Sequence, residues 1–369
     1  MRFTLSTKPL IDALALGIVN ANVSKFYQKS NMAQLRARGN NLAINLEANN
    51  IVTEIRLKGS GEAPDTGHMF VDSLLLKQLV STFEASTTTL EFSDGGLVLY
   101  NGKSKFVLPR TVEGDAGLEL KAPDMPDYSA PTVDIKKADW KFVKENQMYA
   151  IAMSFIHPVY TRVYCGSDGS VIVGDFDNSL FTLSQKGNFG DTCLLSDTII
   201  NLFNSLPEGS KLRQIGKSYL IEVQTDGFEY LSQFTPYYES DEGVGTYNAP
   251  IILEMMEHPA GGYAEVNTAA VNKFLSQADL LSTNTDDHIR LGVKGTQLFL
   301  KDKNVDCVVD IKSDESADYF CDFKTSALKS VLSNYSTESV NIAPMKQDDD
   351  TVGIIVWSDE MTTVLAGIE

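Results

Sequence analysis

The sequence predicts an α+β protein of three tandem domains, each built from two β-α-β-β-β units. Two observations lead to this fold. A strand, a helix of about three turns and three further strands recur six times along the 369 residues. Each predicted helix has a single apolar face and must therefore pack against a sheet. The copies pair into predicted domains spanning residues 1–125, 126–249 and 250–369, each with two helices on one side and antiparallel sheets on the other.

The first copy illustrates the pattern. Its predicted helix, near residues 8–20, repeats Leu10 and Leu14 at helical spacing on one face. Three segments of alternating polarity follow, and turn residues such as Asn49 and Asn50 separate them, which favours hairpins. The strands of this copy are predicted at residues 2–5, 32–38, 42–48 and 51–58.

The later copies repeat this order. Two stretches rich in Pro, Gly and acidic residues, 111–130 and 236–250, have little periodicity and are predicted to be linkers. The other helices are predicted at residues 73–84, 138–151, 197–206, 268–281 and 325–335. The strand before each of these helices is predicted at residues 69–71, 132–135, 192–195, 263–266 and 319–323. The strands after them are predicted at 88–93, 97–101, 105–110, 160–167, 170–175, 180–185, 211–215, 219–224, 228–234, 288–294, 297–301, 306–311, 340–344, 352–357 and 362–368.

The composition suits a packed cytoplasmic protein. Hydrophobic residues make up 43% of the chain, enough for several cores. No apolar run reaches the ~18–20 residues of a membrane span, and the alternating start of the chain lacks the apolar core of a signal peptide. We therefore expect no membrane partner. The cysteines are far apart without a C-x-x-C pair, which favours reduced, buried thiols over disulfides or zinc. They are Cys165, Cys193, Cys307 and Cys321.

The charge is large and unevenly distributed. A net charge of −18 argues, taken alone, against nucleic acid, because Lys and Arg supply the affinity for phosphate. The predicted helices, however, hold equal numbers of basic and acidic residues, so the negative excess lies in strands, turns and linkers. The basic ones are Lys8, Lys77, Lys141, Lys144, Lys273 and Lys329, and the acidic ones are Asp12, Glu84, Asp139, Glu145, Asp197 and Asp279.

Short matches accompany the sixfold repeat. They are the opening Met1-Arg2-Phe3-Thr4, the segment Ser104-Lys105-Phe106-Val107-Leu108, Leu280-Leu281-Ser282, and Ile289-Arg290-Leu291-Gly292-Val293 with Gln297-Leu298. Together with the repeat, which spans essentially the whole chain, they resemble the bacterial-type DNA sliding clamp, the beta subunit of the replicative polymerase. The resemblance implies a ring around double-stranded DNA that confers processivity, without chemistry or a cofactor. The divergence suggests a phage-encoded clamp.

The resemblance also implies how the ring closes. Family rings contain six domains, so a chain of three implies a head-to-tail homodimer. The matching interface residues are Lys103, Lys105, Phe106 and Leu108 on one side, and Leu280 and Leu281, near Asp302 and Asp306, on the other. This chain departs from the denser acidic patch of the family, because Lys301-Asp302-Lys303 is mixed in charge.

In such a ring the helices line the hole and the acidic sheets face outward. Lys137, Lys141 and Lys144 share one helix face, and Lys25, Lys211 and Arg213 follow helices from which they could reach the hole. The alternative is that these are ordinary solubilising residues. The residues expected to face DNA are Lys25, Lys77, Lys137, Lys141, Lys144, Lys211, Arg213, Lys273 and Lys329.

Family clamps bind the polymerase and the clamp loader through short peptides held in an apolar cleft between the second and third domains. The matching positions are Thr161, Leu180, Val364 and Leu365. The surrounding sequence departs from the family, since Asp177-Asn178-Ser179-Leu180 replaces its Gly-His-Arg-Leu turn. A partner with a different peptide is expected, and the alternative is that the leucines are simply core residues.

Two rival classes remain. A metal-dependent nuclease could use acidic residues around Asp175 and Asp177 or the run 348–350, although acidic residues are common in turns and the histidines are scattered. An acidic clamp homologue could act as a DNA mimic or inhibitor that binds replication proteins off DNA. Retention on circular compared with linear DNA separates these classes from a clamp.

Overall fold

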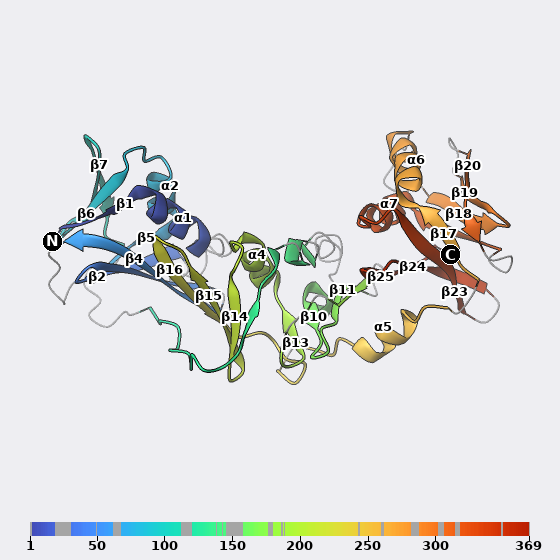
Figure 1. Ribbon diagram of the computed structural model, residues 1–369, viewed down its shortest axis with the longest axis horizontal. Coiled ribbons are helices and arrows are strands. Elements are labelled where there is room, and N and C mark those ends of the chain that lie inside the picture. The colour runs from blue at the N-terminus through green and yellow to red at the C-terminus, as the bar shows by residue number, and fades with distance from the viewer. Residues whose placement is uncertain are drawn as a thin grey trace. The chain divides into compact units, whose positions relative to one another are not determined.

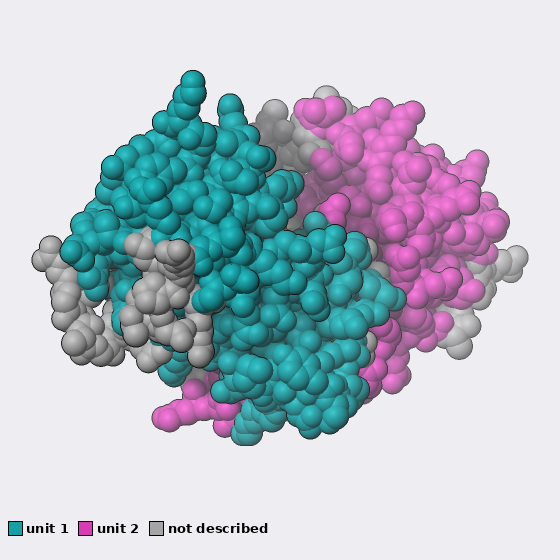
Figure 2. Space-filling view, turned by 60° about the vertical axis from the view of Figure 1, so that its left-hand side comes forward, with its two compact units in different colours: residues 1–140, 198–236 teal, residues 141–197, 237–369 magenta. Residues whose placement is uncertain are grey.

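The computed structural model of the chain divides into two compact units, coloured separately in Figure 2. Unit 1 comprises Met1–Trp140 and Thr198–Pro236, and unit 2 comprises Lys141–Asp197 and Tyr237–Glu369. The middle predicted domain, residues 126–249, contributes to both units, and the three-domain division stays a prediction. The residues that the structure describes are 2–18, 31–48, 50–61, 68–111, 120–137, 139–141, 143–144, 158–175, 180–185, 187, 189–242, 244–259, 262–281, 288–301, 306–313, 318–347 and 350–368.

Unit 1 is built on a sheet of antiparallel strands (Figure 1). Its elements are β1 (Arg2–Ser6), α1 (Thr7–Gly17), β2 (Met32–Arg38), β3 (Asn41–Ala48), β4 (Ile51–Gly61), β5 (His68–Asp72), α2 (Ser73–Val80), β6 (Thr87–Ser93), β7 (Gly96–Asn101), β8 (Ser104–Pro109), β9 (Thr132–Asp134), α4 (Asp197–Ser205), β14 (Lys211–Ile215), β15 (Ser218–Gln224) and β16 (Phe228–Phe234).

Unit 2 contains two antiparallel sheets. Its elements are the 3-10 helix η3 (Pro158–Thr161), β10 (Val163–Cys165), β11 (Val171–Asp175), β12 (Leu180–Ser184), β13 (Cys193–Leu195), α5 (Ala249–Met255), β17 (Ala264–Asn267), α6 (Thr268–Leu281), β18 (His288–Lys294), β19 (Gln297–Lys301), β20 (Asp306–Asp310), β21 (Lys312–Ser313), β22 (Tyr319–Lys324), α7 (Thr325–Ser333), β23 (Ser339–Gln347), β24 (Asp350–Trp357) and β25 (Met361–Ala366).

The predicted β-α-β-β-β order is confirmed in the first, second, fourth, fifth and sixth copies. In the third copy the strands β9 to β12 are described, whereas most of the helix expected at 138–151 falls outside the described residues. The predicted α+β class with antiparallel sheets is likewise confirmed.

Paired copies exchange their first strands. β1 of the first copy pairs with β6 of the second, while β5 of the second copy pairs with β2 of the first. The same exchange joins β9 to β14 and β13 to β10, and it joins β17 to β23 and β22 to β18. Because neither copy completes its sheet alone, the two copies of a pair are interlocked.

Last strands join one pair of copies to the next. β4 pairs with β16 in unit 1, and β12 pairs with β25 in unit 2. The two junctions match in detail, since each has a buried pair of hydroxyls between its strands: Thr53 and Ser232 at 2.9 Å, and Thr182 and Thr363 at 3.1 Å. Of the last strands described, β8 and β20 lie at sheet ends, next to β7 and β19 respectively.

The larger sheet of unit 2, which runs from β13 through β12 and β25 to β21, lies between two apolar clusters, because its side chains alternate between the two faces. The inner cluster contains Leu180, Ile354 and Leu365 together with buried residues of α6 and α7. The outer cluster, on the opposite face, consists of Val159, Tyr160, Ile172, Phe181, Leu194, Val244, Tyr247, Ala249, Ile252, Met256, Ala343, Ile355, Trp357 and Val364. Figure 1 shows α5 across β24 and β25 from α6 and α7.

Several predicted boundaries are wrong. α2 ends at Val80, so Glu84 is not in a helix. The strand expected from residue 160 begins at Val163, because the preceding residues form η3 and bury Tyr160 in the outer cluster. The linker expected at 236–250 continues into α5, a helix that was not predicted from the sequence.

Candidate functional site

The outer side of β8 is basic around an apolar centre. Lys103 and Lys105 are exposed, and the Lys105 ammonium lies 5.9 Å from the centroid of the Tyr100 ring. Between the charges and Pro109, Val107 is 59% exposed, although the sequence reading did not select it. Because β8 ends its sheet, its outer backbone groups are unpaired within the chain and could accept a further strand.

Two other residues predicted for self-association face inward from β8. The Phe106 ring stacks on Phe83 with centroids 5.4 Å apart, and Leu108 is buried. They therefore fix the position of the edge strand against its own sheet.

The other sheet end, β20, is acidic around an apolar centre. Asp306, Val308 and Asp310 alternate along its exposed side, and Val308 is 47% exposed. At the end of α6, Leu280 is 84% exposed, the largest value among the described large apolar residues. Leu281 closes the same helix, and its side chain lies outside the described residues.

Basic residues are sparse on the exposed helix faces. Lys273 is exposed on α6, and Lys77 on α2 and Lys329 on α7 are half-buried. On α1, the Lys8 ammonium lies 2.5 Å from a carboxylate oxygen of Asp12, so this pair carries no net charge. The other accessible helix positions are mostly small and polar, and include Asn201, Ser205, Ser276, Gln277, Ser326, Ser330 and Ser333.

The remaining lysines predicted to face DNA are only partly accounted for. Lys137, Lys141 and Lys211 are exposed and Lys144 is half-buried, whereas Lys25 lies outside the described residues. Their common orientation toward DNA stays a prediction.

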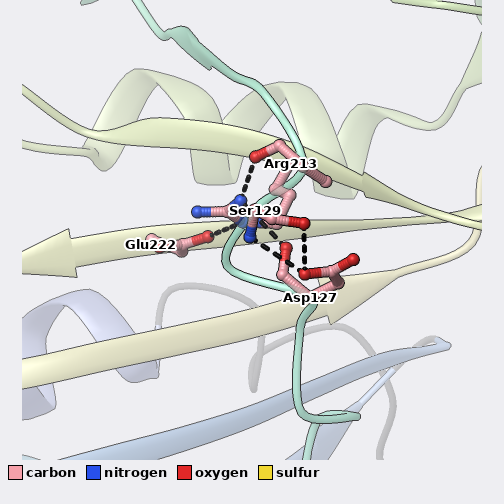
Figure 3. A network of polar contacts seen from close by, with 5 residues as sticks. Asp127, Ser129, Arg213 and Glu222 are labelled. Carbon is pink, nitrogen blue, oxygen red and sulfur yellow. Dashed lines mark hydrogen bonds and ion pairs between the residues drawn. The ribbon is translucent and has the colours of Figure 1, made fainter.

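Arg213, also predicted to face DNA, has another role. It is 6% exposed on β14, and its Nε donates to Glu222 Oε1 at 2.5 Å (Figure 3). Its Nη1 donates to the carbonyl oxygens of Asp127, at 3.2 Å, and Ala130, and the guanidinium lies over the Tyr128 ring. The hydrogen bond to Glu222 raises the pKa of Arg213. Arg213 therefore anchors the segment that carries Asp127 and Ala130, and its orientation toward DNA stays a prediction.

That segment, residues 120–131, is called the first connector. Its Leu120 is buried, and Gln233 of β16 exchanges hydrogen bonds with the Asp124 amide and carboxylate at 2.6 and 2.9 Å. Farther along, the Ser129 hydroxyl and amide donate to Asp127 Oδ1 at 2.6 and 2.9 Å, which lowers the pKa of Asp127. Polar contacts thus hold most of the first connector.

Three of the four residues of the predicted peptide cleft lie on opposite faces of one sheet, and the fourth, Thr161, ends η3. Leu180 and Leu365 are cross-strand partners, and both are buried in the inner cluster. Val364, opposite Phe181, is buried in the outer cluster, and Thr161 is half-buried at the end of η3. Of the three strand residues, only Val364 therefore belongs to the side of the sheet that lacks α6 and α7.

Residues 237–256, called the second connector, cover that side of the sheet. Tyr237 exchanges backbone hydrogen bonds with Leu194, and the Tyr247 hydroxyl donates to the Ile172 carbonyl at 3.1 Å. The sequence did contain a signal for the helix of this connector: Pro250 lies in its first turn, where proline is favoured.

The acidic residues and histidines that a metal-dependent nuclease would need are scattered where the structure describes them. No group of three or more His, Cys, Asp or Glu residues there could hold a metal ion. Asp177, Asp348 and Asp349 fall outside the described residues, and Asp350 is exposed at the start of β24. His258 stacks on Trp357 with centroids 4.8 Å apart, a packing contact.

The four cysteines are free thiols in the structure. Cys165 and Cys193 are direct partners on β10 and β13, and burial raises the pKa of the Cys165 thiol. Cys321 is buried, whereas Cys307 is only half-buried. None of the described helices has the length and apolar character needed to cross a membrane.

Solved structures of bacterial sliding clamps are similar to the whole chain. The Caulobacter crescentus sliding clamp matches with a TM-score of 0.77 at 14% identity, and the DNA polymerase III beta subunit of Pseudomonas aeruginosa with 0.75 at 13%. The Helicobacter pylori beta clamp, solved with a DNA ligase peptide, matches with 0.72 at 12%. Each match covers 100% of both chains. No protein-family model and no curated protein matches the sequence.

These matches define the class of fold: it is that of the DNA sliding clamps. More particularly, it is the fold of the DNA polymerase III beta subunits, as the resemblance in sequence implied.

Proposed function

We propose that this protein is a DNA sliding clamp, two copies of which close head to tail around double-stranded DNA and hold a replicative DNA polymerase on its template. The ring performs no chemistry and needs no cofactor. The fold match over the full length of both chains supports this function. The low identity to bacterial clamps supports a phage-encoded origin, with the ring acting in the cytoplasm of a bacterial or infected cell.

The pairing of last strands carries the proposal. Within the chain, β4 pairs with β16 and β12 pairs with β25. By the same rule, β8 of one copy pairs with β20 of the other, and the reverse contact closes the ring. A head-to-tail contact that closes after two copies leaves neither edge uncovered.

The two edges are complementary in charge and shape. An antiparallel register that places Val107 opposite Val308 also places Lys105 opposite Asp310. Direct cross-strand apolar and opposite-charge pairs each stabilise a sheet. Leu280 lies on α6, which contacts β20, and adds apolar surface beside the edge. This register therefore specifies which cross-strand pairs an experiment must test.

The dimer is tested by sedimentation. Val107→Glu is expected to give monomers, because a carboxylate would face Val308 and Asp310. Leu75→Glu, at an exposed apolar position on α2 instead of an edge, is the control and should stay dimeric. Lys105→Glu and Asp310→Lys should each weaken the dimer, and their combination should restore it. Dimers of unchanged strength in Val107→Glu would contradict the pairing.

DNA would pass along the helix faces. We propose that Lys25, Lys77, Lys137, Lys141, Lys144, Lys211, Lys273 and Lys329 face it. With few lysines and many Ser, Asn and Gln side chains there, phosphate contacts are weak, and topological linkage holds the ring. The clamp should stay on nicked circular DNA and leave linear DNA by its ends. If the protein leaves circular and linear DNA equally fast, and binds the polymerase in the absence of DNA, it acts instead as an acidic DNA mimic.

The Lys137, Lys141 and Lys144 group gives a second test. Charge reversal of all three is expected to shorten the products of primer extension without lowering the melting temperature. Charge reversal of Lys103, an edge lysine away from the helices, is the comparison and should act through dimer formation instead.

Short peptides of the polymerase and the clamp loader are the proposed partners. The Helicobacter pylori clamp solved with a DNA ligase peptide supports this mode of recruitment. On this chain, Val364 would meet a peptide only where the outer cluster opens, because it is buried there, and Thr161 lies half-buried at the end of η3.

A further inference from the structure

The two halves of the second connector are attached in different ways. The first half, residues 237–247, has directional contacts. The Arg162 guanidinium lies 4.3 Å from the centroid of the Tyr237 ring, and its Nη1 donates to the Val244 carbonyl at 3.3 Å. Tyr247 is fully buried against Tyr160 and Tyr164. This half is a fixed part of unit 2.

The second half, α5, is held mainly by apolar side chains. Ala249, Ile252 and the following Met256 belong to the outer cluster, whereas Ile251 is 54% exposed. Asn248, the residue before the helix, makes no side-chain cap hydrogen bond. A helix of 7 residues is far below the length that is stable alone in water. α5 therefore exists only while it is packed on the sheet.

The chain on both sides of α5 suits a pivot. Gly245 and Asn248 before the helix have φ of 84° and 56°, and Gly262 after it has φ of 77°. Glycine adopts such angles without steric cost and can leave them easily. Past the helix, the described polar contact is from His258 Nε2 to the Thr362 hydroxyl at 2.7 Å.

We propose that α5 is a displaceable internal occupant of the site for partner peptides, and that such a peptide binds by taking its place. This inference rests on the proposed clamp function, because a clamp is what recruits such peptides. The partner is a short helical peptide with apolar residues at the spacing of Ala249, Ile252 and Met256, three and then four positions apart. Helix-in-groove binding uses this spacing.

Under α5 the peptide would meet a continuous apolar surface. Ile355, Trp357 and Val364 belong to the outer cluster with the buried residues of α5, and each is less than a tenth exposed. α5 packs in this cluster, and the rings of His258 and Tyr263 also cover Trp357. Because a peptide must compete with α5, its apparent affinity falls by the fraction of clamps that are open.

The test compares two neighbouring isoleucines of α5. Ile252→Ser removes a fully buried anchor, and Ile251→Ser changes an exposed position of the same helix. In a Trp140→Phe background, Trp357 is the only tryptophan, and it should emit at longer wavelength in Ile252→Ser alone. Amide exchange of residues 249–256 should rise at least about tenfold in that variant. An unchanged Trp357 emission with α5 still protected would overturn the proposal.

The second measurement uses a fluorescein-labelled peptide of residues 248–258 as the probe. It should bind Ile252→Ser at least about tenfold more tightly than the wild type or Ile251→Ser. Equal binding by all three would also overturn the proposal. If near-ultraviolet circular dichroism shows that Ile252→Ser has lost its fold, Ile252→Ala and Ile252→Val replace it, and affinity must rise as the side chain shortens.

Neither measurement needs DNA or a polymerase. Retention on nicked circular DNA is measured separately on the same proteins. Retention without preferential peptide binding overturns only the role of α5, whereas wild-type protein that fails to stay on circular DNA contradicts the clamp function.

Discussion

The two connectors solve the same structural problem by different means. Both cross the sheet face away from the helices, near a junction of last strands. The first is fixed mainly by polar contacts, among them the buried Arg213 and the amide of Gln233. The second contributes Val244, Tyr247 and α5 to an apolar cluster. Directional bonds give the first connector one position, whereas non-directional burial allows the end of the second to be exchanged for another apolar segment.

Truncating the aromatic anchor of the second connector should have the largest effect. Tyr247→Ala is expected to destabilise unit 2 by about 3–5 kcal/mol, because it empties a fully buried aromatic site. Urea unfolding followed by Trp357 fluorescence in a Trp140→Phe background measures this. Tyr128→Ala in the first connector, followed by Trp140 in a Trp357→Phe background, is the matched control at a 57% exposed position, and its cost should stay below about 1 kcal/mol.

Removing the charged anchor of the first connector should come next. Arg213→Met is expected to cost about 3 kcal/mol, because Glu222 loses its partner in a largely buried setting. Trp140, which packs on Phe203 in unit 1, reports the change in a Trp357→Phe background. Lys211→Met on the same strand, exposed, is the control. If both substitutions had equal effects, the anchoring role of Arg213 would be wrong.

A smaller loss is expected at the other polar attachment. Gln233→Ala removes two hydrogen bonds to Asp124 and should cost about 1 kcal/mol. Amide exchange should accelerate at residue 124 while the second connector keeps its protection. Loosening of both connectors together would show that they are not independent.

The smallest effect is a pH dependence at His258, two residues past the second connector. Burial lowers the pKa of His258, so the folded state binds a proton less readily than the unfolded state. The resulting stability is present above the unfolded pKa near 6.5 and is lost as the pH falls toward the folded pKa. After solvent screening we expect less than about 0.5 kcal/mol. In Trp357 fluorescence the effect should vanish in His258→Phe, which keeps a ring beside Trp357.

Local patterns were enough to predict the repeat. Helices such as α1 and α7 bury one face, and the hairpins between strands carry their turn signals in neighbouring residues. Segments that come from a distant part of the chain and cross a sheet were not predictable from local patterns. Leu212 and Arg213 are consecutive on β14, and both are buried. Arg213 is buried because the first connector, which is far from β14 in the sequence, packs over it. From the strand alone, Arg213 should have pointed to solvent.

The residues of the candidate site also divide into those that the sequence predicted and those that it did not. The edge strand β8 and the lysines near it were predicted from the resemblance of residues 104–108 to the sliding clamps, and alternation in polarity indicated only a strand with one buried face. The importance of Val107 and Val308 was not predicted, because a valine in a strand is ordinarily buried. The predicted cleft residues Leu180 and Leu365 are paired, yet α6 and α7 cover them, and that cover is set by the register of β12 with β25.

The pairing of β4 with β16 also determines how long β4 lacks a neighbour while the chain is being synthesised. Thr53 and Ser232, which face each other there, are 179 residues apart in the chain. At a ribosomal rate of about 5–20 residues per second, β4 waits roughly 10–35 s for its neighbour. During that interval its backbone groups can pair with a strand of another nascent chain, which makes the partly made protein a natural client for chaperones.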